Sequence, residues 1–358
     1  MAGIASVRQM SASRKQRPAA ARPGGTASAR PTAKAVRTGP TAPARKPAAR
    51  PPARAKAAAD EPAVGRVVGP VPVLARVAGA LAVLGVLLRL AVPAIPLAHA
   101  GPIDLGGGNA FDWIALLPFA AVVGAGGALC ALGRLPRLGL AVLLTAGTAI
   151  AGLLLITGYQ LDSGDRSSQD LQIGLAGSFH YSVGGGLLLQ FIADAVLVAA
   201  FLVASVAWSR TGMEDEGRFD GLRPRFATAG LTVGLVAAVA VGMPQLSSSV
   251  SGAAAPGVLQ QDGLALLGGL VLALAVAGWG VIAATLRPRL ATVGAFAGLA
   301  AVLLTEALRS ALTAARSPVV GAGPGMITEL IAVAGFALLA VGAWRLSARP
   351  APAGDEDA

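Results

Sequence analysis

Charged residues are scarce in this 358-residue sequence. Asp, Glu, Lys and Arg make up 13% of it, whereas apolar residues make up 54%, and the mean hydropathy is +0.67. Soluble domains have a similar apolar fraction but carry about 25% charged residues. This chain has the apolar fraction of a soluble domain but only about half of its charged residues. Such a composition indicates that most of the chain lies in lipid. The composition therefore excludes an ordinary soluble globular fold.

Histidine and cysteine are almost absent, with two His and one Cys. His99 and His180 fall outside the apolar runs, so no expected membrane helix offers a His ligand to a haem. Cys130 alone cannot form an intrachain disulfide. The aspartates at 162–170 lack EF-hand spacing and indicate a solvated turn, and zinc, nucleotide-loop and nucleophile-elbow motifs are missing. We expect no metal, no cofactor and no catalytic residue.

Basic charge is concentrated at the start of the sequence, and no lysine follows Lys56. Residues 1–66 hold 14 Lys and Arg against Asp60 and Glu61, a net charge of +12. This Ala/Pro-rich segment has no apolar periodicity, so burial cannot offset the entropy of ordering it. A disordered cytoplasmic tail is predicted. The Arg, Ala, Gly and Pro bias of the whole chain is typical of a high-GC bacterial coding sequence.

The tail has several candidate partners. Its charge should attract the anionic head groups of the inner leaflet, at about 1 kcal/mol per nearby Lys or Arg. Specific nucleic-acid binding is disfavoured, because the tail lacks aromatic residues for stacking. A protein partner and phosphorylation of the Ser and Thr residues beside basic residues stay open.

Eight apolar runs follow the tail, and each reaches the roughly 20 residues that a membrane-spanning helix needs. Turns with two arginines each, Arg134-Leu135-Pro136-Arg137 and Arg287-Pro288-Arg289, join four of these runs into two hairpins. The sequence therefore predicts an all-α integral membrane protein of about eight transmembrane helices. The runs lie at about residues 71–91, 113–133, 138–159, 186–208, 226–245, 263–285, 290–309 and 326–346.

Arginines mark one side of the membrane. With a cytoplasmic N-terminus, the inner connections carry eight arginines, whereas the outer connections carry only Arg166 and Arg316. This distribution follows the positive-inside rule. It predicts a multi-pass protein of the cell (plasma or inner) membrane with both the N- and the C-terminus in the cytoplasm.

The two halves of the membrane region resemble each other. We expect two parallel four-helix repeats, at 71–208 and 226–346, and a short cytoplasmic C-terminal tail at 347–358. Two interpretations stay open for the small residues spaced four apart on the second and sixth helices: they bring these helices to the centre of the bundle, or they only reflect the abundance of Ala and Gly. These residues are Ala120, Gly124, Ala128, Gly269, Ala273 and Ala277. The matching positions are Ala78-Gly79 with Ala229-Gly230, Pro93 with Pro244, Gly126 with Gly278, Pro136-Arg137-Leu138 with Pro288-Arg289-Leu290, and Trp208 with Trp344.

Ionisable residues inside the expected spans are candidates for function, because charge in hydrocarbon is costly. Asp194 is the deepest, and Gln190 lies one turn before it on the same face. Glu329 has nearly the same expected depth in the matching helix. Glu306 and Arg309 are spaced i,i+3 and can pair with each other.

These residues, with Arg89 near the outer end of the first helix, all fall in the outer half of the membrane. They predict an outward-facing polar pocket for a cation, a proton or a small polar solute. The alternative is that the terminal residues reach the interface separately and only Asp194 is buried.

Three functions stay open at this point. Duplication and membrane carboxylates favour a transporter or permease-like protein with a polar site in the outer half of the membrane. The small loops and missing motifs favour a non-catalytic envelope scaffold or accessory subunit that recruits partners through its basic tail. An enzyme acting on a lipid-linked substrate, with Asp112, Asp162 or Asp165 beside His180, is disfavoured because no motif supports it.

Overall fold

The structure, a computed structural model, describes residues 71–100, 103–105, 110–162, 181–211, 222–248, 257–316, 318 and 320–347. Within these ranges eight helices are long and apolar enough to cross a membrane, which confirms the predicted number. The predicted tail at 1–66 lies outside the described residues, as do Asp165, Asp170, His180 and residues 348–358.

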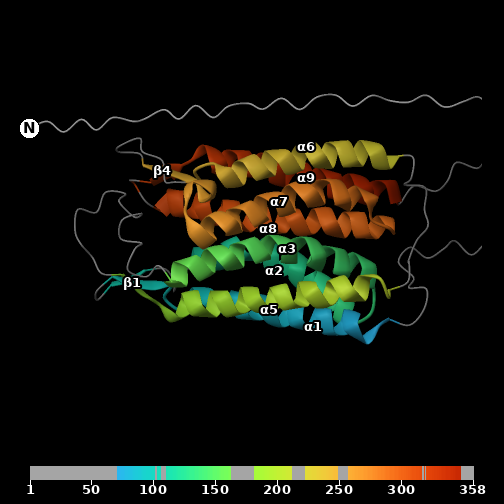
Figure 1. Ribbon diagram of the computed structural model, residues 1–358, viewed down its shortest axis with the longest axis horizontal. Helices are drawn as coiled ribbons and strands as arrows, with labels where there is room; N and C mark the ends of the chain where they lie inside the picture. Colours follow the sequence, from blue (N-terminus) through green and yellow to red (C-terminus); the bar gives the residue numbers. More distant parts are fainter. Residues whose placement is uncertain are drawn as a thin grey trace, which may run out of the picture. The chain divides into compact units, whose positions relative to one another are not determined.

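The helices follow the predicted apolar runs, because a helix satisfies its own backbone hydrogen bonds in hydrocarbon. They form one bundle with their axes roughly parallel or antiparallel (Figure 1). In chain order they are α1 (Val73–Ala91), α2 (Ala110–Ala131), α3 (Pro136–Asp162), α5 (Gly185–Trp208), α6 (Arg223–Gly242), α7 (Gly263–Thr285), α8 (Arg289–Arg316) and α9 (Pro324–Ser347).

Two helices are longer than predicted. α3 has 27 residues and α8 has 28, whereas about 20 suffice to cross the hydrocarbon. α8 continues past residue 309 to Arg316, and α3 includes Asp162, which was expected in a loop. The extension of α8 consists mainly of Ala, Leu and Arg, which favour helix beyond the apolar limit. α2 also begins early, so Asp112 lies in its first turn and not before it.

Short strands join the helices at one end of the bundle, which the all-α prediction did not include. β1 (Ala98–Ala100) pairs antiparallel with β2 (Ile103–Leu105) and with β3 (Tyr181–Val183). β4 (Leu246–Ser248) pairs antiparallel with β5 (Val320–Ala322). Figure 1 shows β1 and β4 at the same end, which we call the strand-bearing end.

The centre of the bundle is formed by α3 and α8. About 67% of the α3 span and 78% of the α8 span are buried, against at most 44% for the other six helices. α3 packs against α2, α5, α7 and α8, and α8 packs also against α2 and α9. Figure 1 shows α1, α2, α3 and α5 on one side of the bundle and α6 to α9 on the other.

Glycines on α8 explain this close central packing. A Cβ on Gly294 would overlap the carbonyl oxygen of Leu138, and one on Gly298 would overlap the Thr145 hydroxyl. These two glycines are spaced four apart, the pattern that lets membrane helices approach closely. The interpretation that the second and sixth helices, α2 and α7, occupy the centre was therefore wrong. Instead α2 packs on α1, where Gly124 faces Val86, and α7 packs on α6, where Ala277 faces Gly234.

Candidate functional site

Arg89 lies at the centre of a cluster of charged side chains near the strand-bearing end. It lies in the last turn of α1, and its side chain is only 2% exposed. Its Nη1 lies 3.5 Å from Oδ1 of Asp194 on α5, and its Nη2 lies 3.4 Å from Oε1 of Glu306 on α8. One guanidinium group therefore connects carboxylates of two helices that belong to different halves of the bundle.

Arg309 extends the cluster along α8. Its Nη1 lies 3.3 Å from Oε2 of Glu306, so the two oxygens of that carboxylate face two different arginines. Arg309 is 39% exposed and Glu306 is 25% exposed, whereas Asp194 is fully buried. The cluster therefore runs from a buried end at Asp194 to a partly exposed end at Arg309.

The buried end of the cluster is incompletely hydrogen-bonded. Within the described part of the chain, both carboxylate oxygens of Asp194 lack a hydrogen-bond partner, and so does the Nε of Arg89. The ion-pair distance of 3.5 Å exceeds the roughly 2.7–2.9 Å of a charge-assisted hydrogen bond. Buried polar groups normally have partners, because an unsatisfied one costs about 1–3 kcal/mol. The geometry therefore leaves hydrogen-bonding capacity at Asp194.

Glu329 lies beside this cluster without an arginine of its own. It is on α9, is 4% exposed, and α9 packs against α8, the helix that carries Glu306. Among the described residues no hydrogen bond or ion pair reaches its carboxyl group. Gln190, the remaining predicted residue, is half-buried on α5. The structure thus brings Arg89, Asp194, Glu306 and Arg309 into direct contact. It places Glu329 on α9, which packs against α8, and Gln190 one turn nearer the strand-bearing end than Asp194.

Two features of this end were missed in the sequence. The Phe119 ring of α2 covers the Arg89 guanidinium, with the Cζ of Arg89 4.7 Å from the ring centroid. Arg316 pairs with Asp112 at 3.4 Å and lies over the Phe111 ring at 4.7 Å. Aromatic residues make up only 4% of the chain. A Phe near the end of a predicted span could therefore have indicated that an arginine packs against its ring.

The cluster holds no recognisable metal site. Within the described residues, no three His, Cys, Asp or Glu side chains come together as they would around a metal ion. Two hollows lie elsewhere on the described residues, and neither is lined by a member of the cluster. What the arrangement offers is two guanidinium groups, three carboxylates and several unused hydrogen-bond acceptors.

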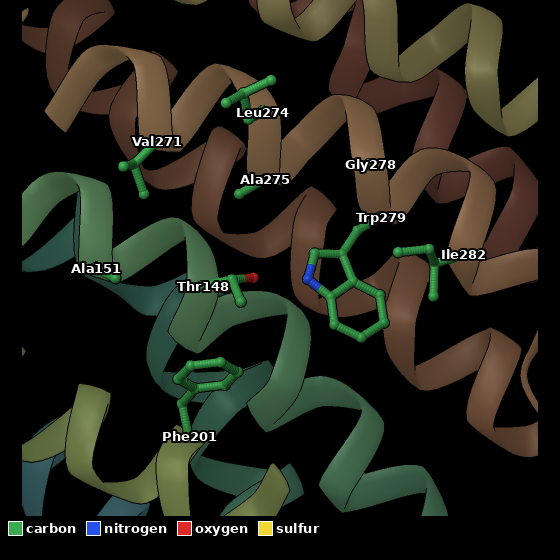
Figure 2. Close-up of a pocket in the computed structure, with 9 residues that line it drawn as sticks. All are labelled: Thr148, Ala151, Phe201, Val271, Leu274, Ala275, Gly278, Trp279 and Ile282. Atoms are coloured by element: carbon green, nitrogen blue, oxygen red, sulfur yellow. The ribbon is translucent and has the colours of Figure 1, made fainter. Parts of the chain in front are cut away.

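One of those hollows is an apolar groove of about 440 Å³ between α3, α5 and α7. Figure 2 shows Thr148 and Trp279 pointing toward each other across it, with Phe201 below. Thr148 donates its hydroxyl hydrogen within its own helix, to the carbonyl oxygens of Leu144 and Thr145. The groove suits hydrocarbon and is separate from the charged cluster. The other hollow is a shallow one at the start of α6, beside Arg225.

Comparison with protein families, curated proteins and solved structures finds no match to this chain. The class of the protein therefore rests on its own sequence and structure. Eight long apolar helices make it a multi-pass α-helical membrane protein. A more particular assignment has to come from the charged cluster.

Proposed function

We propose that this protein is a transporter or permease-like membrane protein, with a site for a small polar solute or cation at the Arg89–Asp194–Glu306 cluster. The observation that carries this proposal is the buried, incompletely hydrogen-bonded carboxylate of Asp194. Ionisable residues within membrane spans mark solute and ion pathways, because a chain without such a role would avoid their cost. The cluster also joins α1 and α5 to α8, the kind of link that alternating access would break and remake.

Internal duplication supports the same proposal, because many transporters are built from repeats. In each half the first helix packs against the second and the fourth, and the third packs against the same two. Gly186 N donates to Pro96 O, and Gly325 N donates to Pro244 O in the same way. This pattern pairs Pro244 with Pro96, three residues beyond the Pro93 expected from the sequence.

The inner ends of the two central helices also match. Arg137 of α3 donates to the Thr211 carbonyl oxygen just after α5, and Arg289 of α8 donates to the Leu346 carbonyl oxygen near the end of α9. In each half, an arginine of the third helix therefore donates a hydrogen bond to the backbone at the end of the fourth helix. This shared role supports two parallel units at 71–208 and 226–346.

The membrane orientation is proposed from the charges at the two ends. Every acidic residue within the described ranges lies toward the strand-bearing end, whereas the charged residues described at the opposite end are all arginines. The positive-inside rule then places the strand-bearing end outside and both termini in the cytoplasm of the cell membrane. The basic tail would lie on the anionic inner leaflet.

This orientation predicts which side reacts with an impermeant thiol reagent. In a Cys130→Ala background, Asp262→Cys at the strand-bearing end should react in intact cells. Arg225→Cys at the other end should react only after permeabilisation. Both positions are exposed in the structure, so access to the reagent depends on the membrane alone. The opposite labelling pattern would reverse the proposed orientation.

Native mass spectrometry of protein purified gently from its own membrane tests the proposed site. We expect a retained small solute or cation in the wild type and its loss in Asp194→Asn. Removing one charged hydrogen-bonding partner should weaken binding by about 10- to 150-fold, since such bonds contribute about 1.5–3 kcal/mol. The same variant should abolish transport of that solute in reconstituted vesicles.

Asp112→Asn is the matched control, because Asp112 forms an exposed ion pair with Arg316 outside the cluster. It should retain the solute. Equal retention in Asp194→Asn and the wild type would refute the site. A stoichiometric protein partner that is lost on deletion of residues 1–66 would instead favour the envelope scaffold, with a structural role for the cluster.

A further inference from the structure

The cluster and the neighbouring Glu329 together contain more carboxyl groups than arginines. Arg89 and Arg309 supply two positive charges, whereas Asp194, Glu306 and Glu329 are three carboxyl groups. Both arginines are occupied, Arg89 by Asp194 and Glu306, and Arg309 by Glu306. Glu329 is the carboxyl group left over.

No other charge compensates Glu329 among the elements that pack against its helix. α9 packs on α8, α6 and β4. On α8, Arg309 pairs with Glu306 and Arg316 pairs with Asp112, whereas the negative charge of Glu306 would repel a second carboxylate. The charged residues of α6, Arg223 and Arg225, lie at the opposite end of the bundle, and β4 contains none. An ionised Glu329 would therefore be an unpaired buried charge, which is strongly unfavourable in hydrocarbon.

The matching position in the other half is uncharged. Counted from the glycines that make the equivalent hydrogen bonds, Gly186 and Gly325, the fourth residue onward is Gln190 in α5 and Glu329 in α9. Glutamine has the shape of a glutamic acid that keeps its proton, and it never carries charge. Asp194 then lies one turn deeper than Glu329, not at the nearly equal depth expected from the sequence.

We propose that Glu329 holds an exchangeable proton, and that this proton is the cation that balances the cluster while no other cation is bound. Since the described residues show no grouping suited to a metal ion, the proton is the ligand that this carboxyl group fits. On exchange, the O–H bond of the Glu329 carboxylic acid breaks, the proton passes to water, and an incoming cation balances the carboxylate. This coupling of proton to solute rests on the proposed transport function.

A buried acceptor lies at the same end of α9. Gln245 precedes β4, its Oε1 is buried without a hydrogen-bond donor among the described residues, and its Nε2 donates to the Ala240 carbonyl oxygen. A Cβ on Gly325 would lie 2.9 Å from that Nε2, so Gln245 packs against the first turn of α9, one turn before Glu329. This unused acceptor therefore lies one turn from the proposed proton on Glu329.

Infrared spectroscopy of the full-length protein in lipid bilayers tests this assignment without any solute. The wild type at neutral pH should show the carbonyl stretch of a buried carboxylic acid, which shifts in D₂O and fades on alkaline titration. The band should be lost in Glu329→Gln and retained in Asp112→Asn.

Two results would overturn the proposal: no such band in the wild type, or an unchanged band in Glu329→Gln. The D₂O shift of the wild type is informative even if Glu329→Gln fails to fold. Because the readout needs no solute, loss of the transport proposal would leave the protonation of Glu329 intact, and the reverse also holds.

Discussion

Replacing Arg89 with glutamine is expected to lower the free energy of unfolding by about 3–5 kcal/mol, the cost of breaking a buried ion pair by removing one partner. Within the described residues, the substitution leaves Asp194 fully buried with no counter-charge within ion-pair distance, and it removes the ion pair between α1 and Glu306 of α8. It also removes the cation that lies against the Phe119 ring. Thermal unfolding in detergent can be followed with a fluorogenic thiol reagent, because Cys130 is the single cysteine and is fully buried.

Two further variants separate charge from packing. Arg316→Gln breaks the exposed pair with Asp112 and should cost about 0–1 kcal/mol. Adding Asp194→Asn to Arg89→Gln removes the unpaired charge and should recover most of the lost stability, since neutral replacements of both partners are tolerated. If Arg89→Gln is no worse than Arg316→Gln, the Arg89–Asp194 pair does not stabilise the fold.

The helices could be predicted because an apolar run of about 20 residues matches the length of helix that crosses the hydrocarbon core. Their polar extensions could not, since nothing in the Ala- and Leu-rich sequence before Arg316 shows where α8 leaves the membrane. The strands were missed for a different reason. Ala98 pairs with Val183, far along the chain, and a three-residue segment carries no periodic signal of its own.

The members of the candidate site could be selected from the sequence, but their contacts could not. Asp194 and Glu329 stand out as acids within apolar runs, and the i,i+3 spacing of Glu306 and Arg309 predicts a pairing that the structure contains. The link from Arg89 to Glu306 spans 217 residues. It depends on α8 lying in the centre of the bundle, which follows from the close approach at Gly298 and not from any local pattern.

Gly280 of α7 is the second position at which a single substitution should have a large effect. A Cβ on Gly280 would overlap the carbonyl oxygen of Gly230 on α6, and a Cβ on Gly230 would overlap the carbonyl oxygen of Gly280. Because the obstacle is backbone, no side-chain rotation can relieve it. Gly280→Ala should therefore cost about 1–3 kcal/mol, and Gly280→Val more, as overpacking pushes the two helices apart.

Gly278, two residues earlier on the same helix, provides the matched control. A Cβ there meets nothing within 4 Å and points toward the apolar groove, so Gly278→Ala should leave the unfolding temperature unchanged or slightly raise it. Both variants add one methyl group to α7, so they differ only in whether α6 is in the way. Equal unfolding temperatures for Gly280→Ala and Gly278→Ala would show that α6 and α7 do not approach at these glycines. A selective loss in Gly280→Ala would show that small residues set the distance between the first two helices of the second half.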